Sequence, residues 1–128
     1  MYSDVELLRY IATEDAAETE ALFAAAREAR APYYGNEVYF RGLIEFTNYC
    51  RNDCYYCGIR AGNRRVERYR LSPGEILDCC RAGDELGFKT FVLQGGEDPY
   101  FTDDRVVELV GAIRRRYPDH AITLSIGE

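Results

Sequence analysis

The feature that most constrains this chain is an alternation of three strand-like segments with two helix-like segments. Residues 38–46, 89–94 and 121–126 are rich in β-branched and aromatic side chains, which favours strands. The stretches 72–87 and 102–118 between them have helical spacing of apolar residues and helix-starting and helix-ending signals. Strands that alternate with helices pair in parallel through right-handed crossovers, so the sequence predicts an α/β fold.

Residues 1–36 are predicted to form a short helical segment ahead of the core domain. Ser3 and Glu6 have the spacing of a capping box at the start of a first helix. Thr13 is the predicted cap of a second, Ala- and Glu-rich helix that runs to about Arg30 and is ended by Pro32 and Gly35.

The core domain is predicted to span residues 37–128 and to be incomplete. Three parallel strands are too few to close a barrel, and the last strand would leave an exposed apolar edge. We therefore expect the N-terminal part of a (β/α) TIM-type barrel, truncated after about three strands, from a longer enzyme.

Polar or reactive residues follow the first two strands directly. Residues 50–57 come after the first strand and residues 95–98 after the second. The carboxyl ends of parallel strands lie together, so these segments should meet at one edge of the sheet. In the third strand, alternation puts Thr123 and Ser125 on one face, expected to be the barrel interior; ordinary alternation with solvent on one side is the alternative.

Three cysteines carry the strongest chemical signal. Cys50, Cys54 and Cys57 have the spacing C-x3-C-x2-C. Three thiolates this close can bind three irons of a cubane cluster and leave the fourth iron open, which makes it a reaction site. A structural zinc site is the alternative, but zinc usually takes four ligands, and the single histidine, His120, lies far along the chain.

The other two cysteines and His120 have simpler interpretations. Cys79 and Cys80 are adjacent in a predicted helix, so they do not share a face. We expect both to be small, buried or half-buried helix residues. His120 is expected to be a surface residue.

Composition excludes several classes of function. Apolar residues make up 47% and charged residues 30% of the 128 residues, which is typical of a globular chain. The formal charge of −6 argues against a nucleic-acid partner. No apolar run has the length of a membrane span, and the first residues lack the pattern of a secretory signal, so we expect no membrane association and a cytoplasmic location.

The cysteine motif, with an aromatic residue (Tyr56) just before its third cysteine, resembles the signature of the radical S-adenosylmethionine (SAM) superfamily. Within the superfamily, the wider sequence is similar to the HydE family of [FeFe]-hydrogenase maturases. The segments that carry this likeness are residues 41–50, 57–60, 93–100 and 123–128.

This resemblance implies a [4Fe–4S] cluster and SAM as cofactors. In the superfamily, an electron from the cluster cleaves SAM to methionine and a 5′-deoxyadenosyl radical. It implies that Cys50, Cys54 and Cys57 bind the iron, with no further catalytic residue assigned. The residues that it places around SAM are Tyr56 beside the adenine, Gln94, the Gly95-Gly96-Glu97 contact to the amino group, Thr123 and Ser125, with a weaker correspondence at Glu128.

The resemblance also implies partners: a small-molecule or organometallic substrate, an electron donor such as ferredoxin or flavodoxin, and other hydrogenase maturases. Two alternatives stay open. The first is a related radical SAM enzyme of the methylornithine synthase or biotin synthase type. The second is a non-catalytic iron–sulfur module. Because most of the substrate cavity would lie on the missing strands, we expect the fragment to be inactive alone.

Overall fold

The computed structural model of the chain describes residues 2–127 and separates into two compact units, Met1–Tyr39 and Phe40–Glu128. Within the described residues, no helix is both long enough and apolar enough to cross a membrane.

The first unit consists of two helices, α1 (Asp4–Ala12) and α2 (Ala16–Tyr34). The capping box predicted at the start of α1 is present. The Glu6 carboxylate accepts a hydrogen bond of 2.8 Å from the Ser3 backbone N–H, and the Ser3 hydroxyl accepts one from the Glu6 N–H. These bonds satisfy two backbone groups that have no partner inside the helix.

The predicted cap of α2 was wrong, whereas one of its two predicted stop signals is confirmed. Its cap is Asp15, whose carboxylate accepts hydrogen bonds from two backbone N–H groups of the first turn. Thr13 instead follows the end of α1, and its hydroxyl donates to Glu18 at 2.7 Å. At the other end, α2 continues past Arg30 and through Pro32 to Tyr34, and Gly35 ends it as predicted, with a positive φ of 54° and its N–H donating to the Ala31 carbonyl.

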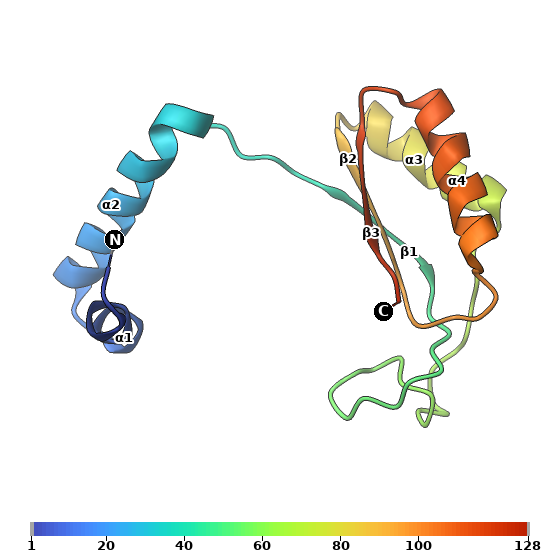
Figure 1. The fold of residues 1–128 in the computed structure, drawn as a ribbon, viewed down its shortest axis with the longest axis horizontal. Helices are drawn as coiled ribbons and strands as arrows, with labels where there is room; N and C mark the ends of the chain where they lie inside the picture. Colours follow the sequence, from blue (N-terminus) through green and yellow to red (C-terminus); the bar gives the residue numbers. More distant parts are fainter. Residues whose placement is uncertain (1, 128) are drawn as a thin grey trace. The chain divides into compact units, whose positions relative to one another are not determined.

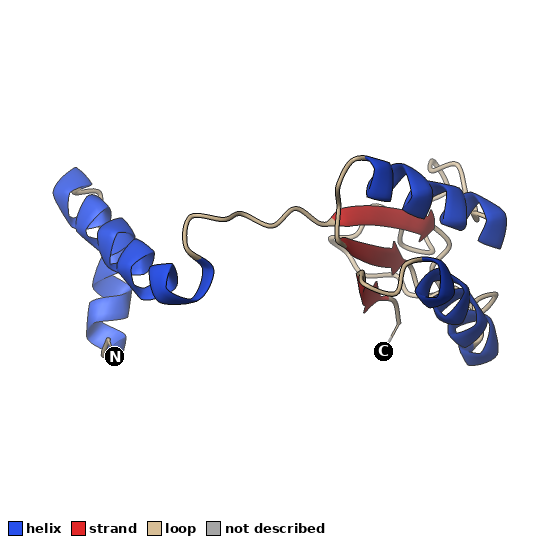
Figure 2. Ribbon diagram, turned by 90° about the horizontal axis from the view of Figure 1, so that it is seen from above, coloured by secondary structure: helices blue, strands red, loops and turns tan. Residues whose placement is uncertain are grey.

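The second unit is a three-stranded parallel sheet with two helices. The strand order is β1-β2-β3, as the alternation predicted, so the α/β fold is confirmed. Figure 1 shows α3 and α4 on the same side of the sheet, and Figure 2 shows the three strands side by side. The elements are β1 (Gly42–Thr47), α3 (Pro73–Glu85), β2 (Thr90–Gly95), α4 (Asp103–Arg116) and β3 (Ala121–Ser125).

The first strand is shorter than predicted. It begins at Gly42, and the apolar side chains of Val38, Tyr39 and Phe40 are exposed. Gly42 lies opposite Phe91, close to the start of β2. Residues 38–41 thus have no neighbouring strand to pair with, and β-propensity alone does not form a ladder.

The core lies between the sheet and the two helices. Ile44, Phe46, Phe91 and Leu93 cover the helix-facing side of β1 and β2. They pack against the buried helix residues Ile76, Cys80, Leu109 and Ile113. Both helices that the structure describes in this unit lie on one side of the sheet (Figure 2), and alternate residues of the strands point to the other face, where Leu43, Gln94, Thr123 and Ser125 are exposed.

His120 is buried, contrary to the prediction of a surface position. Only 6% of the residue is exposed, and its ring stacks on Phe91 with a centroid separation of 4.9 Å. Its Nε2 lies 3.0 Å from the Asp84 carboxylate. His120 directly precedes β3, so it lies at the amino end of the sheet. This end is opposite the carboxyl edge, where residues 50–57 and 95–98 lie.

Candidate functional site

The segments that follow β1 and β2 meet at the carboxyl edge of the sheet, as predicted. The Arg51 backbone N–H, within the cysteine segment, donates a 2.9 Å hydrogen bond to the Glu97 carbonyl. We call residues 48–70 the cysteine loop and residues 95–98 the Gly-Gly-Glu-Asp turn. The parallel pairing of β1 with β2 brings the loop and the turn together.

Gly96 allows this contact because its backbone lies directly against the cysteine loop. A Cβ atom at this position would come 2.2 Å from the Tyr49 carbonyl oxygen and 2.7 Å from the Cys50 Cβ. Both distances are far below a normal contact, so a side chain would displace the chain at the first cysteine. Gly95 is also tight, with the Thr47 methyl group 2.7 Å from the position of its Cβ. The turn thus requires both glycines for close backbone approach.

Asp98 ties three segments together. Its carboxylate accepts hydrogen bonds from the Arg70 Nε at 2.7 Å and Nη2 at 2.9 Å, in a two-pronged ion pair. It also accepts bonds from the Thr47 hydroxyl at 2.7 Å and from the Tyr100 backbone N–H at 3.1 Å. The Asp98 side chain is only 1% exposed, so these four bonds replace the water that it gives up.

The charge state of Asp98 follows from these bonds. Burial raises the pKa of the Asp98 carboxyl. The hydrogen bonds from Arg70, Thr47 and Tyr100 outweigh burial and hold the pKa below its usual range, so Asp98 is ionised at neutral pH. The Arg70 guanidinium also lies 3.9 Å from the centre of the Tyr49 ring, next to Cys50, which adds a cation–π contact.

Arg68 holds the inside of the cysteine loop. Its guanidinium donates to the carbonyl oxygens of Ile59 at 2.7 Å, Arg60 at 2.8 Å and Asn63 at 3.2 Å, and also to that of Asn48. No carboxylate in the described part of the chain pairs with it. Arg68 therefore acts as a structural cross-link between the two arms of the loop.

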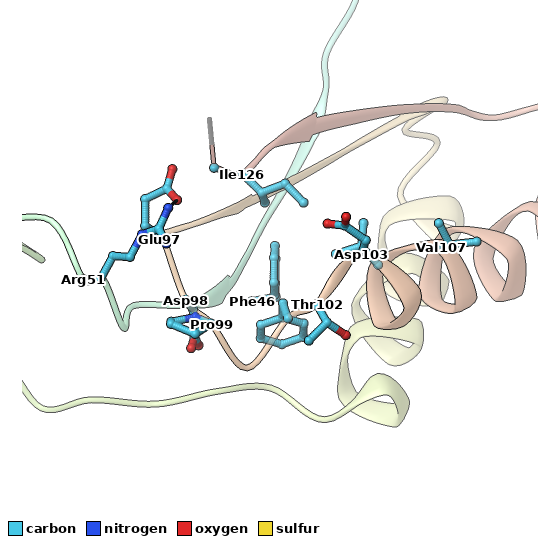
Figure 3. Close-up of a pocket in the computed structure, with 13 residues that line it drawn as sticks. Phe46, Arg51, Glu97, Asp98, Pro99, Thr102, Asp103, Val107 and Ile126 are labelled. Atoms are coloured by element: carbon cyan, nitrogen blue, oxygen red, sulfur yellow. Dashed lines mark hydrogen bonds and ion pairs between the residues drawn. The ribbon is translucent and has the colours of Figure 1, made fainter.

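Glu97 lies at a cavity of about 500 Å³. Its side chain is 16% exposed, and its carboxylate is 3.4 Å from the Arg51 guanidinium. Figure 3 shows Arg51 and Glu97 at one side of the cavity, and Asp103 and Val107 of α4 at the other. The cavity combines a partly buried anion with apolar walls, which is typical of a small-molecule site.

The three predicted iron ligands share the cysteine loop but do not converge. Cys54 is exposed, whereas Cys50 and Cys57 are half-buried. A turn closes between two of them, with the Cys57 N–H donating to the Cys54 carbonyl at 3.1 Å. Within residues 2–127, no group of three histidine, cysteine or acidic side chains has the geometry of a metal site. Bonds to the metal normally complete the convergence of such ligands.

The helical cysteines behave differently. Cys80 is fully buried in the core of α3, as predicted, whereas Cys79 is exposed. Burial, with a smaller contribution from Cys79, raises the pKa of the Cys80 thiol to about 11. A thiol that remains protonated at neutral pH is a poor metal ligand.

The remaining predicted SAM-binding residues lie on the open face of the sheet or in the loop. Gln94 and Ser125 are register partners and are both exposed, and Thr123 lies on the same face as Ser125. Tyr56 is 93% exposed in the cysteine loop. Glu128 lies outside the described residues. The structure therefore brings Gly96 against Cys50 and the Glu97 carbonyl against the Arg51 N–H, whereas Tyr56 lies in the loop and Gln94, Thr123 and Ser125 lie on the sheet.

The residues present fit a cluster of the predicted kind. The donor set is three thiols within eight residues, which suits iron and not a hard cation. The loop that carries them is cross-linked at Arg68 and joined to the Gly-Gly-Glu-Asp turn through Asp98, so the first cysteine has a fixed position beside Gly96.

Comparison with known proteins agrees with this arrangement. The sequence profile of the Radical SAM superfamily matches residues 44–128. The chain belongs to the radical SAM superfamily. Members of this superfamily use a [4Fe–4S] cluster and S-adenosylmethionine.

Several relatives are similar over most of the chain. It is 44% identical to the [FeFe] hydrogenase maturase subunit HydE of Thermotoga maritima, over 92% of this chain and 33% of the relative. It is 40% identical to the 3-methylornithine synthase of Methanosarcina acetivorans, over 88% of this chain and 32% of the relative. The chain thus spans about a third of the length of these curated relatives.

Solved structures support the fold assignment. The crystal structure of methylornithine synthase (PylB) matches with a TM-score of 0.85 at 34% identity, over 96% of this chain and 36% of that protein. The [FeFe]-hydrogenase maturase HydG from Carboxydothermus hydrogenoformans matches with a TM-score of 0.78 at 29% identity, over 91% of this chain and 27% of that protein. The predicted N-terminal part of a radical SAM TIM-type barrel is confirmed.

The first prediction concerns Gly96. We expect Gly96→Ala to displace the backbone at Tyr49 and Cys50, to cost about 1–3 kcal/mol of stability, and to reduce iron uptake on anaerobic reconstitution. Gly58→Ala is the control, because a Cβ there meets no atom within 4 Å and the residue is in the same loop. The measurement is the urea midpoint and bound iron of the complete protein. Wild-type values for Gly96→Ala would contradict the close contact.

The second prediction concerns Asp98 and pH. Because the folded-state pKa is lowered, the stabilisation from Asp98 is present above the unfolded-state pKa of about 4 and is lost as pH falls through the folded-state value. We expect Asp98→Asn to cost about 2 kcal/mol or more at pH 7, and its difference from wild type to shrink below pH ~4. Urea midpoints across pH test this, with the exposed Asp119→Asn as control. A difference that is constant with pH would exclude the ionised contact.

Proposed function

We propose that this chain is the cofactor-binding part of a radical SAM enzyme that reductively cleaves SAM at a [4Fe–4S] cluster, in the HydE role of [FeFe]-hydrogenase maturation. The carrying observation is the 44% identity to HydE over 92% of the chain. The direct contact between the cysteine loop and the Gly-Gly-Glu-Asp turn supports this proposal, because it joins the segment that carries the proposed iron ligands to the turn that carries Glu97.

In this proposal Cys50, Cys54 and Cys57 bind three irons of the cluster and leave the fourth open to SAM. When bound, the cluster supplies the electron that cleaves the sulfonium bond of SAM. The protein's contribution is to hold the ligand loop. Arg68 fixes the loop internally, and the Arg70–Asp98 pair fixes its end against the turn.

Glu97 is proposed to bind the SAM amino group. Its carboxylate is mostly buried, and a charge-assisted hydrogen bond is strong in such a place. Gly95 and Gly96 let the backbone approach the same ligand. Tyr56 beside the adenine is a further proposal. Gln94, Thr123 and Ser125 are proposed to line the same site from the open face of the sheet, where the first and last of them are register partners.

The substrate and partners follow from the HydE role. We propose a small-molecule or organometallic substrate, an electron donor such as ferredoxin or flavodoxin, action alongside other hydrogenase maturases, and a cytoplasmic location. These stay predictions. The chain spans only a third of the relatives, so most of a substrate cavity would be formed by sequence outside it.

A methylornithine synthase role is the second candidate. It is favoured by the TM-score of 0.85 with PylB and by the 40% identity to a 3-methylornithine synthase. Two assays separate the roles in the complete protein. Restoration of active [FeFe]-hydrogenase in a strain that lacks its HydE supports the first role, whereas 3-methylornithine among the products supports the second.

The third prediction tests the cluster. We expect Cys50→Ala, Cys54→Ala and Cys57→Ala each to lose the cluster after anaerobic reconstitution, because three ligands leave no spare. Cys79→Ala, the exposed helical cysteine, should keep full iron content. In the wild type, SAM should change the EPR spectrum of the reduced cluster, which requires the open iron. A spectrum that SAM leaves unchanged would instead favour a non-catalytic iron–sulfur module.

The fourth prediction tests Glu97. Glu97→Gln should keep the cluster and weaken SAM binding by about ten- to a hundredfold, as expected for loss of a charge-assisted hydrogen bond of roughly 1.5–3 kcal/mol. Glu67→Gln is the control, because it makes the same charge change at an exposed position of the cysteine loop. SAM titration followed by EPR, with iron counted, is the measurement. Unaltered SAM affinity at full iron content would refute the role, and loss of iron would mean that Glu97 supports the fold.

A further inference from the structure

The cysteine loop is basic although the chain is acidic. Residues 48–70 contain six arginines and two acidic residues, whereas the rest of the chain contains ten basic and twenty acidic residues. The positive charge of this protein is therefore concentrated on the segment that carries Cys50, Cys54 and Cys57. Such a concentration creates a local field that attracts anions to one place.

Most of these arginines have internal partners. Arg68 and Arg70 bind carbonyl groups and Asp98. Arg60 pairs with Asp53 at 3.0 Å, and Arg51 pairs with Glu97. The two arginines that are left are Arg64 and Arg65.

Arg64 and Arg65 are the two that remain available. Both are exposed, and neither forms an ion pair within residues 2–127. Neither lines the cavity beside Glu97, so a role in holding a small anionic ligand there is not supported. Two adjacent, unpaired cations at the surface instead suit contact with a large anionic partner.

The fold of the loop brings these arginines to the cysteines. The side chain of Asn63 donates a 2.8 Å hydrogen bond to the carbonyl of Gly58, the residue after Cys57. Arg64 directly follows Asn63. The loop therefore folds back on itself, and the residue before Arg64 contacts the residue after Cys57.

The same loop also carries an exposed aromatic residue. Tyr55, between the second and third cysteines, is 97% exposed. Tyrosine is enriched among the residues that contribute most to protein–protein binding, because it buries a large area with few rotatable bonds. We call Tyr55, Arg64 and Arg65 the docking surface.

We propose that the docking surface binds an acidic electron-carrier protein; this rests on the proposed function. In the encounter the carrier is oxidised by one electron and the cluster is reduced by one. Electron transfer weakens steeply with distance, so the carrier has to dock where the cluster ligands approach the surface. Electron-transfer encounters are small and are guided by charge, which matches two arginines and one aromatic side chain.

The test uses an acidic [4Fe–4S] ferredoxin and the complete protein. Arg64→Glu/Arg65→Glu is compared with Arg115→Glu/Arg116→Glu, which makes the same change in net charge at exposed positions at the end of α4. Binding of oxidised ferredoxin is measured by calorimetry at about 20 mM and about 500 mM salt, where the screening length differs several-fold. We expect about tenfold or more weaker binding for the loop variant at low salt, a small effect for the control, and little difference at high salt.

Kinetics give a second readout. Arg64→Glu/Arg65→Glu should slow the association of ferredoxin, whereas Tyr55→Ala should speed dissociation and leave the salt dependence of association unchanged. Equal weakening by the loop and control variants would overturn the proposal, because net charge alone would then explain it. No binding of ferredoxin to the wild type, or binding of a single-stranded oligonucleotide in its place, would also overturn it.

The calorimetric test does not need the cluster of this protein, so its outcome is separate from that of the proposed function. Ferredoxin binding that depends on Arg64 and Arg65, in a protein whose cluster does not respond to SAM, would support the docking surface while refuting SAM cleavage. A normal response to SAM, together with ferredoxin binding that Arg64→Glu/Arg65→Glu does not weaken, would support SAM cleavage and refute the docking surface.

Discussion

The ion pair between Arg70 and the buried carboxylate of Asp98 is the interaction on which the site depends. Asp98 ends the turn after β2, Arg70 ends the cysteine loop, and Thr47, which donates to the same carboxylate, ends β1. One carboxylate therefore fixes the separation of three segments that the chain places far apart. Without it, the close contact of Gly96 with Tyr49 would depend on the sheet and on the contacts between Arg51 and Glu97. A buried carboxylate that loses its partners is costly, so Asp98 favours the one geometry of the loop that brings Arg70 and Thr47 to it.

The parts of the fold that depend on local signals could be predicted from the sequence. The start of α3 follows from Ser72 and Glu75, whose side chains form the capping box that their spacing suggests. The meeting of the cysteine segment with Gly95 and Gly96 follows from topology, since parallel strands align their carboxyl ends. The motif of three cysteines likewise predicts the chemistry without any structure.

The parts that depend on partners distant in sequence could not be predicted in this way. Residues 38–40 have strand-like side chains but no strand to pair with, and His120 is buried because Phe91 lies beside it. Arg68 and Arg70 look like solvated charges in the sequence, whereas their partners are backbone carbonyls and a carboxylate 28 residues away. The one available signal was their spacing of two residues in a stretch without a helical pattern, which in an extended chain puts both side chains on the same side.

The distribution of roles along the barrel explains why enzymes of different activity are similar to this chain. The contacts that hold the cysteine loop against the Gly-Gly-Glu-Asp turn all lie within β1, β2 and the segments that follow them. The superfamily shares its two cofactors, so a hydrogenase maturase and a methylornithine synthase need the same kind of cofactor-binding segment. Identities of 44% and 40% over this third of the relatives fit that shared demand. Choice of substrate then has to come from the rest of the barrel. Gln94 and Ser125, register partners whose exposed side chains lie on the open face of the sheet, belong in our proposal to the shared SAM site and not to the part that selects the substrate.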